Sequence, residues 1–357
     1  MNTKIKIIVI GASGILGGLI CTELSQLFKN SIRLFIGDHR IRRGEKTAYN
    51  LNGEFCETDS TNTEKLKASL SDKDIVIVAF NQIEPVIQRI CLENAIPCID
   101  VTAFFSFAKK VQYMYNNHNG SQSTSVLMAG FFPGLSGLLL QKAVKGFDDV
   151  NEANLTLLQN TNAKAGGTGI VDMLKIVSEP VQTIVHNKNV KISGFSFKRQ
   201  ICMPLTCRKY KVRLIHHSEK QVLMDKLQLK NLHYWTAWNS PIFNCLVSML
   251  RKTGLLYFVT HKLKKEALKK VIKHDKNKPE ETILIADVSG LKGNKEQRKY
   301  LAIETFSDYG TTAKCVAALA KIVLKKKTEG ACFPFEITDL YEILSIMNDK
   351  RINYLEY

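Results

Sequence analysis

A glycine-rich turn between a buried strand and a helix is the feature that most constrains this chain. The β-branched run Ile5–Ile10 is typical of a strand buried on both faces of a parallel sheet. It passes directly into the glycine-rich residues 11–18, and an amphipathic helical pattern follows over residues 19–28. Glycines here permit a tight turn, close approach of the backbone to a pyrophosphate, and close helix–strand packing. The opening therefore predicts a dinucleotide-binding unit, with the phosphate charge at the helix N-terminus.

The rest of the first 145 residues continues an alternation of strands and helices. Strand patterns at residues 31–36, 74–80, 96–101 and 125–129 are separated by helical patterns. Such alternation indicates a doubly wound parallel sheet of the Rossmann type. We therefore expect an α/β protein whose residues 1–145 form the NAD(P)-binding domain.

The alternation of strands and helices is lost over residues 146–310. The stretches 154–159, 190–203, 209–216, 281–288 and 298–306 alternate in hydrophobicity or are β-branched, and turn residues fill 289–294. These features favour a mostly antiparallel sheet in an inserted α+β domain for substrate binding or dimerisation. We expect residues 311–357 to form C-terminal helices that return to the Rossmann domain.

Residues after the second strand bear on the choice of cofactor. Asp38 lies about twenty residues beyond the glycines, where an acid that binds the adenosine ribose is expected. Its carboxylate would accept a hydrogen bond from a free 2′-hydroxyl and repel a 2′-phosphate. Arg40, Arg42 and Arg43 could instead bind that phosphate, or they could form a solvated loop. Because the G-x-x-G-x-x-G form is commoner in NADP users, we favour NADP and keep NAD open.

The expected cofactor contacts follow from the rule that ligands collect at the carboxyl ends of parallel strands. The pyrophosphate is assigned to the glycine turn, the ribose to the end of the second strand, and the nicotinamide to later strand ends. The predicted contacts are Gly11, Ser13, Gly14, Ile15, Leu16, Asp38, Arg40, Asp59, Ala79, Phe80, Asn81 and Thr102, with Phe131, Phe132, Pro133 and Gly134 beside the nicotinamide and substrate.

Several chemistries are excluded by missing residues. No tyrosine is followed four positions later by lysine, so short-chain dehydrogenase chemistry is not expected. The nine cysteines form no C-x-x-C pair, and the histidines lack metal-ligand spacing. His216 and His217 are adjacent in a strand-like stretch, so their rings would point to opposite faces. We expect no metal site and no disulfide framework.

Four segments resemble the saccharopine dehydrogenase-like oxidoreductases, the family of saccharopine reductase and carboxynorspermidine synthase. They are residues 11–17, the strand end 99–102 with Ala103 in place of the usual glycine, the turn 129–137 and the helix start 309–313. The resemblance implies hydride transfer between NAD(P)H and a C=N or C=O bond of an amino-acid-derived small molecule. It also implies an inserted second domain. The family's substrate-binding arginines have no clear counterpart, so the substrate stays open.

Few residues are candidates for proton donation or for substrate binding outside the first domain. Tyr309 and His216 are candidates for a proton donor, although reduction of an iminium needs none. Gly167 and Thr168 precede a helical pattern and form either a second anion-binding helix start at the substrate or an interdomain turn. Residues 234–238 hold both tryptophans, and such clusters form cores more often than pockets.

One segment is unusually basic. Residues 251–278 hold ten Lys or Arg against Glu266 and Asp275, which is +8 of the chain's net +17. Apolar residues at helical spacing within it suggest an amphipathic helix that contacts an anionic membrane or an acidic partner, or simply forms a solvated face. The lack of interleaved aromatics and of a recognition motif argues against nucleic acid.

The chain carries no signal-peptide pattern and no apolar run long enough to span a membrane, so we expect a cytoplasmic protein. We also expect it to be homodimeric or otherwise homo-oligomeric. Two alternatives to the reductase remain open. One is a non-catalytic dinucleotide sensor that regulates a partner. The other is a reductase of a lipid or carrier-bound substrate at a membrane surface.

Overall fold

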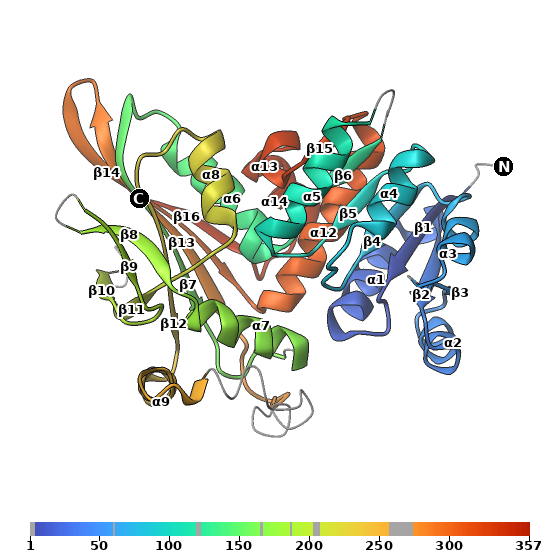
Figure 1. The fold of residues 1–357 in the computed structure, drawn as a ribbon, viewed down its shortest axis with the longest axis horizontal. Helices are drawn as coiled ribbons and strands as arrows, with labels where there is room; N and C mark the ends of the chain where they lie inside the picture. Colours follow the sequence, from blue (N-terminus) through green and yellow to red (C-terminus); the bar gives the residue numbers. More distant parts are fainter. Residues whose placement is uncertain are drawn as a thin grey trace. The chain divides into compact units, whose positions relative to one another are not determined.

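The chain forms two compact units in a computed structural model that describes residues 4–59, 61–118, 123–164, 167–185, 188–202, 208–256 and 274–357. The first unit comprises Met1–Leu138 and Tyr309–Asp349, and the second comprises Leu139–Asp308 and Lys350–Tyr357. A seven-stranded parallel sheet, sheet A, lies in the first unit. A seven-stranded mixed sheet, sheet B, lies in the second (Figure 1).

Sheet A has the strand order β15-β6-β5-β4-β1-β2-β3, and every neighbouring pair is parallel. This order and the helices along the sheet confirm the predicted doubly wound α/β fold. The strands are β1 Ile5–Ile10, β2 Ile32–Asp38, β3 Glu54–Glu57, β4 Ile75–Val78, β5 Cys98–Asp100, β6 Thr124–Val126 and β15 Gly330–Cys332. The helices are α1 Ile15–Phe28, α2 Ile41–Asn50, α3 Thr63–Leu70, α4 Val86–Glu93, α5 Phe105–Asn116, α12 Asp308–Lys325, α13 Pro334–Ile337 and α14 Leu340–Met347, with the short turns η1 Lys29–Ser31 and η2 Phe131–Leu135.

The core of the first unit explains why the first strand is apolar at every position except Lys6. Successive side chains of a strand point to opposite faces. Ile8 and Ile10 pack with Leu66 of α3 and Ile87 of α4 in one buried cluster. Ile7 and Val9 are fully buried as well, so both faces of β1 are covered. A strand covered on both faces needs hydrophobic residues along its covered length. Lys6 lies near the less buried start of β1, where its Nζ is 3.0 Å from Asp72 Oδ2.

Sheet B has the strand order β10-β11-β12-β7-β13-β14-β16, in which only the β12–β7 pair is parallel. The mostly antiparallel sheet is therefore confirmed. Its strands are β7 Asp149–Gln159, β10 Lys198–Cys202, β11 Lys209–Ile215, β12 Leu232–Trp238, β13 Thr282–Lys292, β14 Lys295–Thr305 and β16 Asn353–Glu356, and a separate hairpin pairs β8 Val181–Val185 with β9 Lys188–Ile192. The remaining helices are α6 Ser136–Val144, α7 Gly167–Ser178, α8 Glu219–Lys226 and α9 Pro241–Lys252.

Three local expectations differ from the structure. The stretch 190–203 was expected to be one strand, but β9 ends at Ile192 and β10 begins at Lys198, and Phe195 between them has a φ of 59°. The aromatic residues 234–238 belong to β12, a strand that periodicity did not predict. Residues 353–356 form β16 on the edge of sheet B, whereas 311–357 had been assigned to helices of the first domain.

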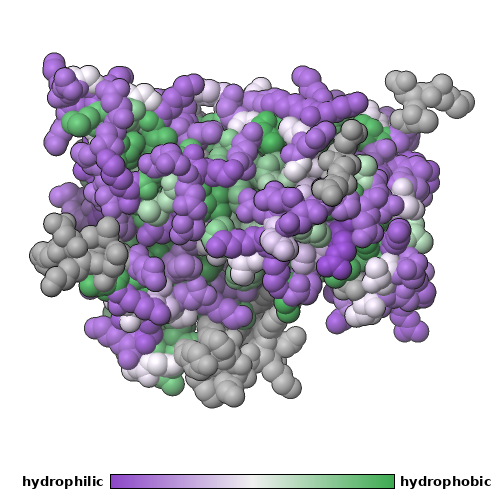
Figure 2. Space-filling view, turned by 45° about the horizontal axis from the view of Figure 1, so that its top comes forward, coloured by the Kyte–Doolittle hydropathy of each residue, from purple (hydrophilic) through white to green (hydrophobic). Residues whose placement is uncertain are grey.

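Within the described residues, no helix is long and apolar enough to cross a membrane. Figure 2 shows a face on which hydrophilic side chains dominate, with hydrophobic patches between them.

Candidate functional site

The glycine turn after β1 has the close packing that its sequence predicts. Gly11 has a φ of +85°, and its N–H donates to Gly37 O at 2.9 Å, which fixes the turn against β2. A Cβ on Gly17 would lie 2.2 Å from Gly11 O, so only glycine lets α1 pack this closely on the turn. A Cβ on Gly14 would lie 3.2 Å from the same oxygen.

The N-terminus of α1 suits an anion. Gly14 is the N-cap, so no side chain caps the helix, and the first turn holds no acidic residue. Ile15 and Leu16 begin the helix, and helix N-termini of this kind bind phosphate through their backbone N–H groups. Ser13 Oγ is shielded from solvent beside Asp38 without a hydrogen bond of normal geometry. The turn therefore fits the pyrophosphate of a dinucleotide.

Backbone hydrogen bonds align the strand ends of sheet A along one edge. Ala79 N donates to Ile10 O at 2.9 Å, and Val101 N donates to Val78 O at 3.2 Å. At the next strand, Ala129 N donates to Asp100 O at 2.9 Å. The predicted residues after β1, β2, β4, β5 and β6 therefore share the carboxyl edge of one sheet, where ligands of such folds collect.

Asp38, predicted to contact the adenosine ribose, is buried at the end of β2 and paired with Arg43. Its side chain is 1% exposed and accepts two hydrogen bonds from Arg43, at 2.8 Å each. Burial alone would raise the pKa of the Asp38 carboxyl, but the hydrogen bonds from Arg43 and from the Arg40 backbone lower it. The Arg43 side chain remains 45% exposed, so a guanidinium rather than a carboxylate faces solvent at the end of β2.

Arg40 and Asp59 lie near the Asp38–Arg43 pair and make local hydrogen bonds. The Arg40 backbone N–H donates to Asp38 Oδ1 at 2.9 Å, while its Nε contacts His39 Nε2 at 3.2 Å. Asp59 accepts hydrogen bonds from the backbone N–H and hydroxyl of Thr61, which lower the pKa of its carboxyl. The Arg40 backbone therefore anchors the start of α2, and Asp59 closes a turn after β3.

A buried carboxylate that sequence reasoning missed lies at the end of β5. Asp100 is fully buried and accepts hydrogen bonds from Thr102 N at 2.6 Å, Gln82 Nε2 at 2.6 Å and Gln88 Nε2 at 2.7 Å. Thr102 Oγ1 in turn donates to Phe80 O at 3.4 Å. Burial outweighs these hydrogen bonds and raises the pKa of Asp100 to about 6. Asp100 thus ties the loops after β4 and β5 together.

The turn at residues 131–134 meets the start of α12, so two motifs far apart in the sequence come together. The Phe131 N–H donates to Thr312 Oγ1 at 3.2 Å. A Cβ on Gly130 would lie 3.3 Å from Thr312 Cγ2, and Gly134 has a φ of +118°. The Phe132–Pro133 bond within this turn is cis. Tyr309 lies at the first turn of the same helix.

The other candidates lie in the second unit. His216 Nε2 is 3.6 Å from Glu179 Oε2, and its side chain is 42% exposed. His217 is buried and stacks on Tyr234 at 4.4 Å, so the prediction of one packed and one exposed ring is confirmed. Burial and the neighbouring His216 lower the pKa of His217 to about 3. Gly167 and Thr168 begin α7, but their side chains are outside the description, as are residues 257–273 of the basic segment.

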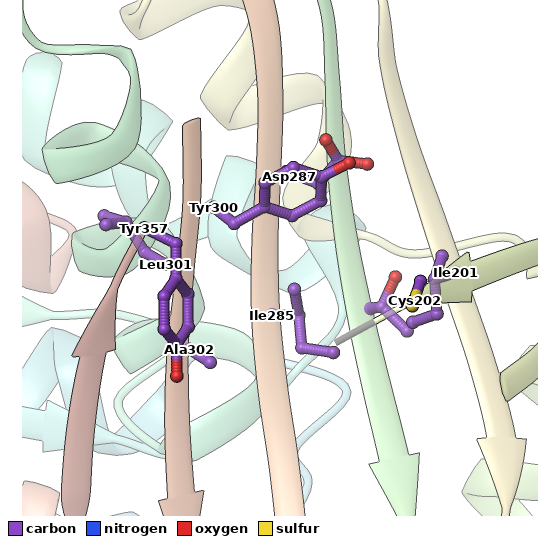
Figure 3. A pocket seen from close by; sticks show the side chains of 9 residues that line it. Ile201, Cys202, Ile285, Asp287, Tyr300, Leu301, Ala302 and Tyr357 are labelled. Atoms are coloured by element: carbon purple, nitrogen blue, oxygen red, sulfur yellow. The ribbon is translucent and has the colours of Figure 1, made fainter. Parts of the chain in front are cut away.

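A shallow pocket lies on sheet B (Figure 3). Its polar end is Asp287, which is bound by Arg298 at 2.8 Å through two hydrogen bonds and by Arg199. The Tyr300 ring lies beside this carboxylate, and Ile201 and Ile285 provide apolar lining. Because both arginines neutralise Asp287, the pocket presents no free acid. Among the described residues, no group of three His, Cys, Asp or Glu side chains could hold a metal ion.

Comparisons with known proteins identify the fold. No family model and no curated protein matches the sequence. Apo saccharopine dehydrogenase (L-Glu forming) from Saccharomyces cerevisiae matches with a TM-score of 0.69 and 11% identity over 99% of each chain. The DAP dehydrogenase of C. glutamicum in complex with DAP matches with a TM-score of 0.49 and 11% identity over 96% of each chain. The described part of the chain therefore shares the fold of the yeast enzyme.

Proposed function

We propose that this protein is an NAD(P)-dependent oxidoreductase. The observation that carries the proposal is the glycine turn, where Gly17 packs on Gly11 O. No side chain caps the N-terminus of α1, so its backbone N–H groups can bind a pyrophosphate. The fold shared with yeast saccharopine dehydrogenase supports it. The bound nicotinamide would supply or accept a hydride, and the residues of this chain would bind and orient the reactants.

We propose NADP(H) as the preferred cofactor. Arg43 donates to the Asp38 carboxylate through Nε and Nη2, which form one edge of its guanidinium, and keeps 45% of its side chain exposed. A carboxylate neutralised in this way no longer repels a 2′-phosphate. An exposed guanidinium is the group best suited to bind one. Arg43 thus replaces Arg40 as our proposed phosphate ligand.

The substrate site is proposed at the turn 131–134, with Thr102 beside it. Asp100 holds Thr102 and Gln82 through hydrogen bonds of 2.6 Å each, and Thr312 holds Phe131. These contacts keep the strand-end loops fixed, which is what orienting a nicotinamide and substrate requires. The substrate class we propose is an amino-acid-derived molecule with a C=N or C=O bond, supported by the shared fold and the motifs at 99–102, 129–137 and 309–313.

Tyr309 is our proposed proton donor. It lies in the first turn of α12, the helix whose Thr312 contacts the 131–134 turn, whereas His216 lies in the second unit beside Glu179. The substitution Tyr309→Phe should lower turnover of a keto substrate about 100-fold or more with little change in cofactor affinity. Unchanged turnover would remove Tyr309 from the mechanism.

The test of the function is oxidation of NADPH by the purified protein with a panel of imines and keto acids formed from amino acids. Saturable, substrate-dependent oxidation that is lost in Gly17→Ala supports the proposal. Tight cofactor binding with no oxidation by any member of the panel would instead favour the dinucleotide sensor.

A further inference from the structure

Helix α9 is firmly held on the end of β12 in the second unit. The Ser240 hydroxyl caps it by accepting a hydrogen bond from Phe243 N at 3.2 Å, and Pro241 occupies its first turn. Asn244 bonds both the N–H and the carbonyl of Trp238, at 3.0 and 2.7 Å. Val247 is buried. Asn244 and Val247 therefore mark the face of α9 that is packed against the protein. Figure 1 shows α9 beyond the end of β12.

The outer face of α9 carries large apolar side chains. Ile242 is 83% exposed, Leu246 is 44% exposed and Met249 is 56% exposed, and Leu255 follows at 52%. The spacing of the first three places them in one stripe along the helix. Four of the eleven large hydrophobic side chains exposed in the described residues thus fall within residues 242–255. Single exposed apolar residues need no explanation, but a contiguous stripe indicates a binding surface.

Positive charge adjoins this stripe. Lys252 is exposed in the last turn of α9, where the Nε of Arg251 is buried, and the sequence from 251 to 278 carries a net charge of +8. Helices that lie in a membrane interface combine an apolar stripe with lysine and arginine in this way. Anionic lipid surfaces attract each such basic residue. The charge therefore distinguishes a bilayer from a second copy of this chain, which is itself strongly positive.

We propose that α9 docks this protein on an anionic lipid bilayer. Ile242, Leu246 and Met249 enter the boundary between headgroups and acyl chains, and Lys252 contacts lipid phosphates. The surface is separate from the dinucleotide site, and it holds whether or not the protein is an oxidoreductase.

The experiment is co-sedimentation of the full chain with vesicles of phosphatidylcholine alone and of phosphatidylcholine mixed with phosphatidylserine. The wild type should bind the mixed vesicles more tightly, and added salt should weaken this binding. The double substitution Ile242→Ser and Met249→Ser should reduce affinity about tenfold or more, since each side chain loses its apolar burial. Lys252→Glu should reduce affinity for the anionic vesicles alone.

Ile83→Ser is the matched control, because Ile83 is also 83% exposed but lies in the first unit. It should bind vesicles like the wild type. If the wild-type protein binds neither vesicle type, the proposal is wrong. A double variant that binds as well as the wild type would also overturn it. Concentration-dependent dimerisation that the double variant abolishes, without vesicle binding, would assign the stripe to a second copy and also overturn it.

Discussion

The contact between Gly17 and the turn before it can be tested by adding one methyl group. In Gly17→Ala the new Cβ would lie 2.2 Å from Gly11 O, 2.7 Å from Ala12 Cα and 2.8 Å from Gly11 C. All three are backbone atoms that cannot rotate away. The helix α1 must therefore move from the turn, and the phosphate cradle must open with it.

The neighbouring Gly18 offers a control in the same helix. A Cβ there would lie 3.6 Å from Ala12 O, an ordinary contact. Replacing glycine by alanine inside a helix stabilises by about 0.5–1 kcal/mol, and both variants receive this gain. Overpacking costs about 1–3 kcal/mol. We expect Gly18→Ala to be as stable as the wild type or more so, and Gly17→Ala to be less stable than Gly18→Ala by about 2 kcal/mol.

Urea unfolding followed by circular dichroism measures the difference in stability, and titration with NADPH measures the effect on the cradle. Gly17→Ala should bind NADPH at least tenfold more weakly than Gly18→Ala, because the N–H groups of α1 no longer converge on the pyrophosphate. If the two variants unfold at the same urea concentration and bind NADPH equally, the packing argument for this turn is wrong.

Three further substitutions test the surrounding contacts. Arg43→Ala should weaken NADPH binding about 10–100-fold while NADH binding changes little, since a charged hydrogen bond contributes about 1.5–3 kcal/mol. An unchanged ratio of the dissociation constants of NADPH and NADH would exclude Arg43 as the phosphate ligand. Asp100 has a folded-state pKa raised from 3.8 to about 6, so its contribution to stability is present below pH 4 and lost as the pH rises through 6. A pKa raised by this amount corresponds to a loss of about 3 kcal/mol, and urea unfolding across this range should show a shallower decline in Asp100→Asn. Equal slopes would contradict the burial argument. Thr312→Val should lower the free energy of unfolding by about 1–3 kcal/mol because Phe131 N loses its acceptor. Thr312→Ser keeps the hydroxyl and should lower it little. Equal effects of the two substitutions would mean that the hydrogen bond contributes nothing.

Periodicity and turn chemistry predicted the local elements of the first unit well. The run of β-branched residues at Ile5–Ile10 and the glycines after it are local signals, and the structure has β1 and α1 there. The start of α1 at Ile15 rather than at residue 19 reflects glycines 17 and 18, which weaken a helical pattern in sequence but are accommodated by packing.

Long-range contacts were beyond sequence reasoning. The parallel pairing of β12 with β7 joins segments about eighty residues apart, and nothing local in residues 232–238 specifies that partner. The pairing of Asp38 with Arg43 depends on how α2 places Arg43 over the carboxylate, which the spacing of these residues alone does not specify. The sequence marks Asp100 only as part of the strand end 99–102, because its three donors come from a loop, a helix and its own turn.

The most direct test of the central claim is a fluorescence titration of the purified protein with NADPH and, separately, with NADH. The account predicts saturable binding of NADPH, with NADH weaker by about tenfold or more, as expected for an exposed guanidinium at the end of β2. Absence of binding by either dinucleotide would make the glycine turn a structural feature only and contradict the proposed function.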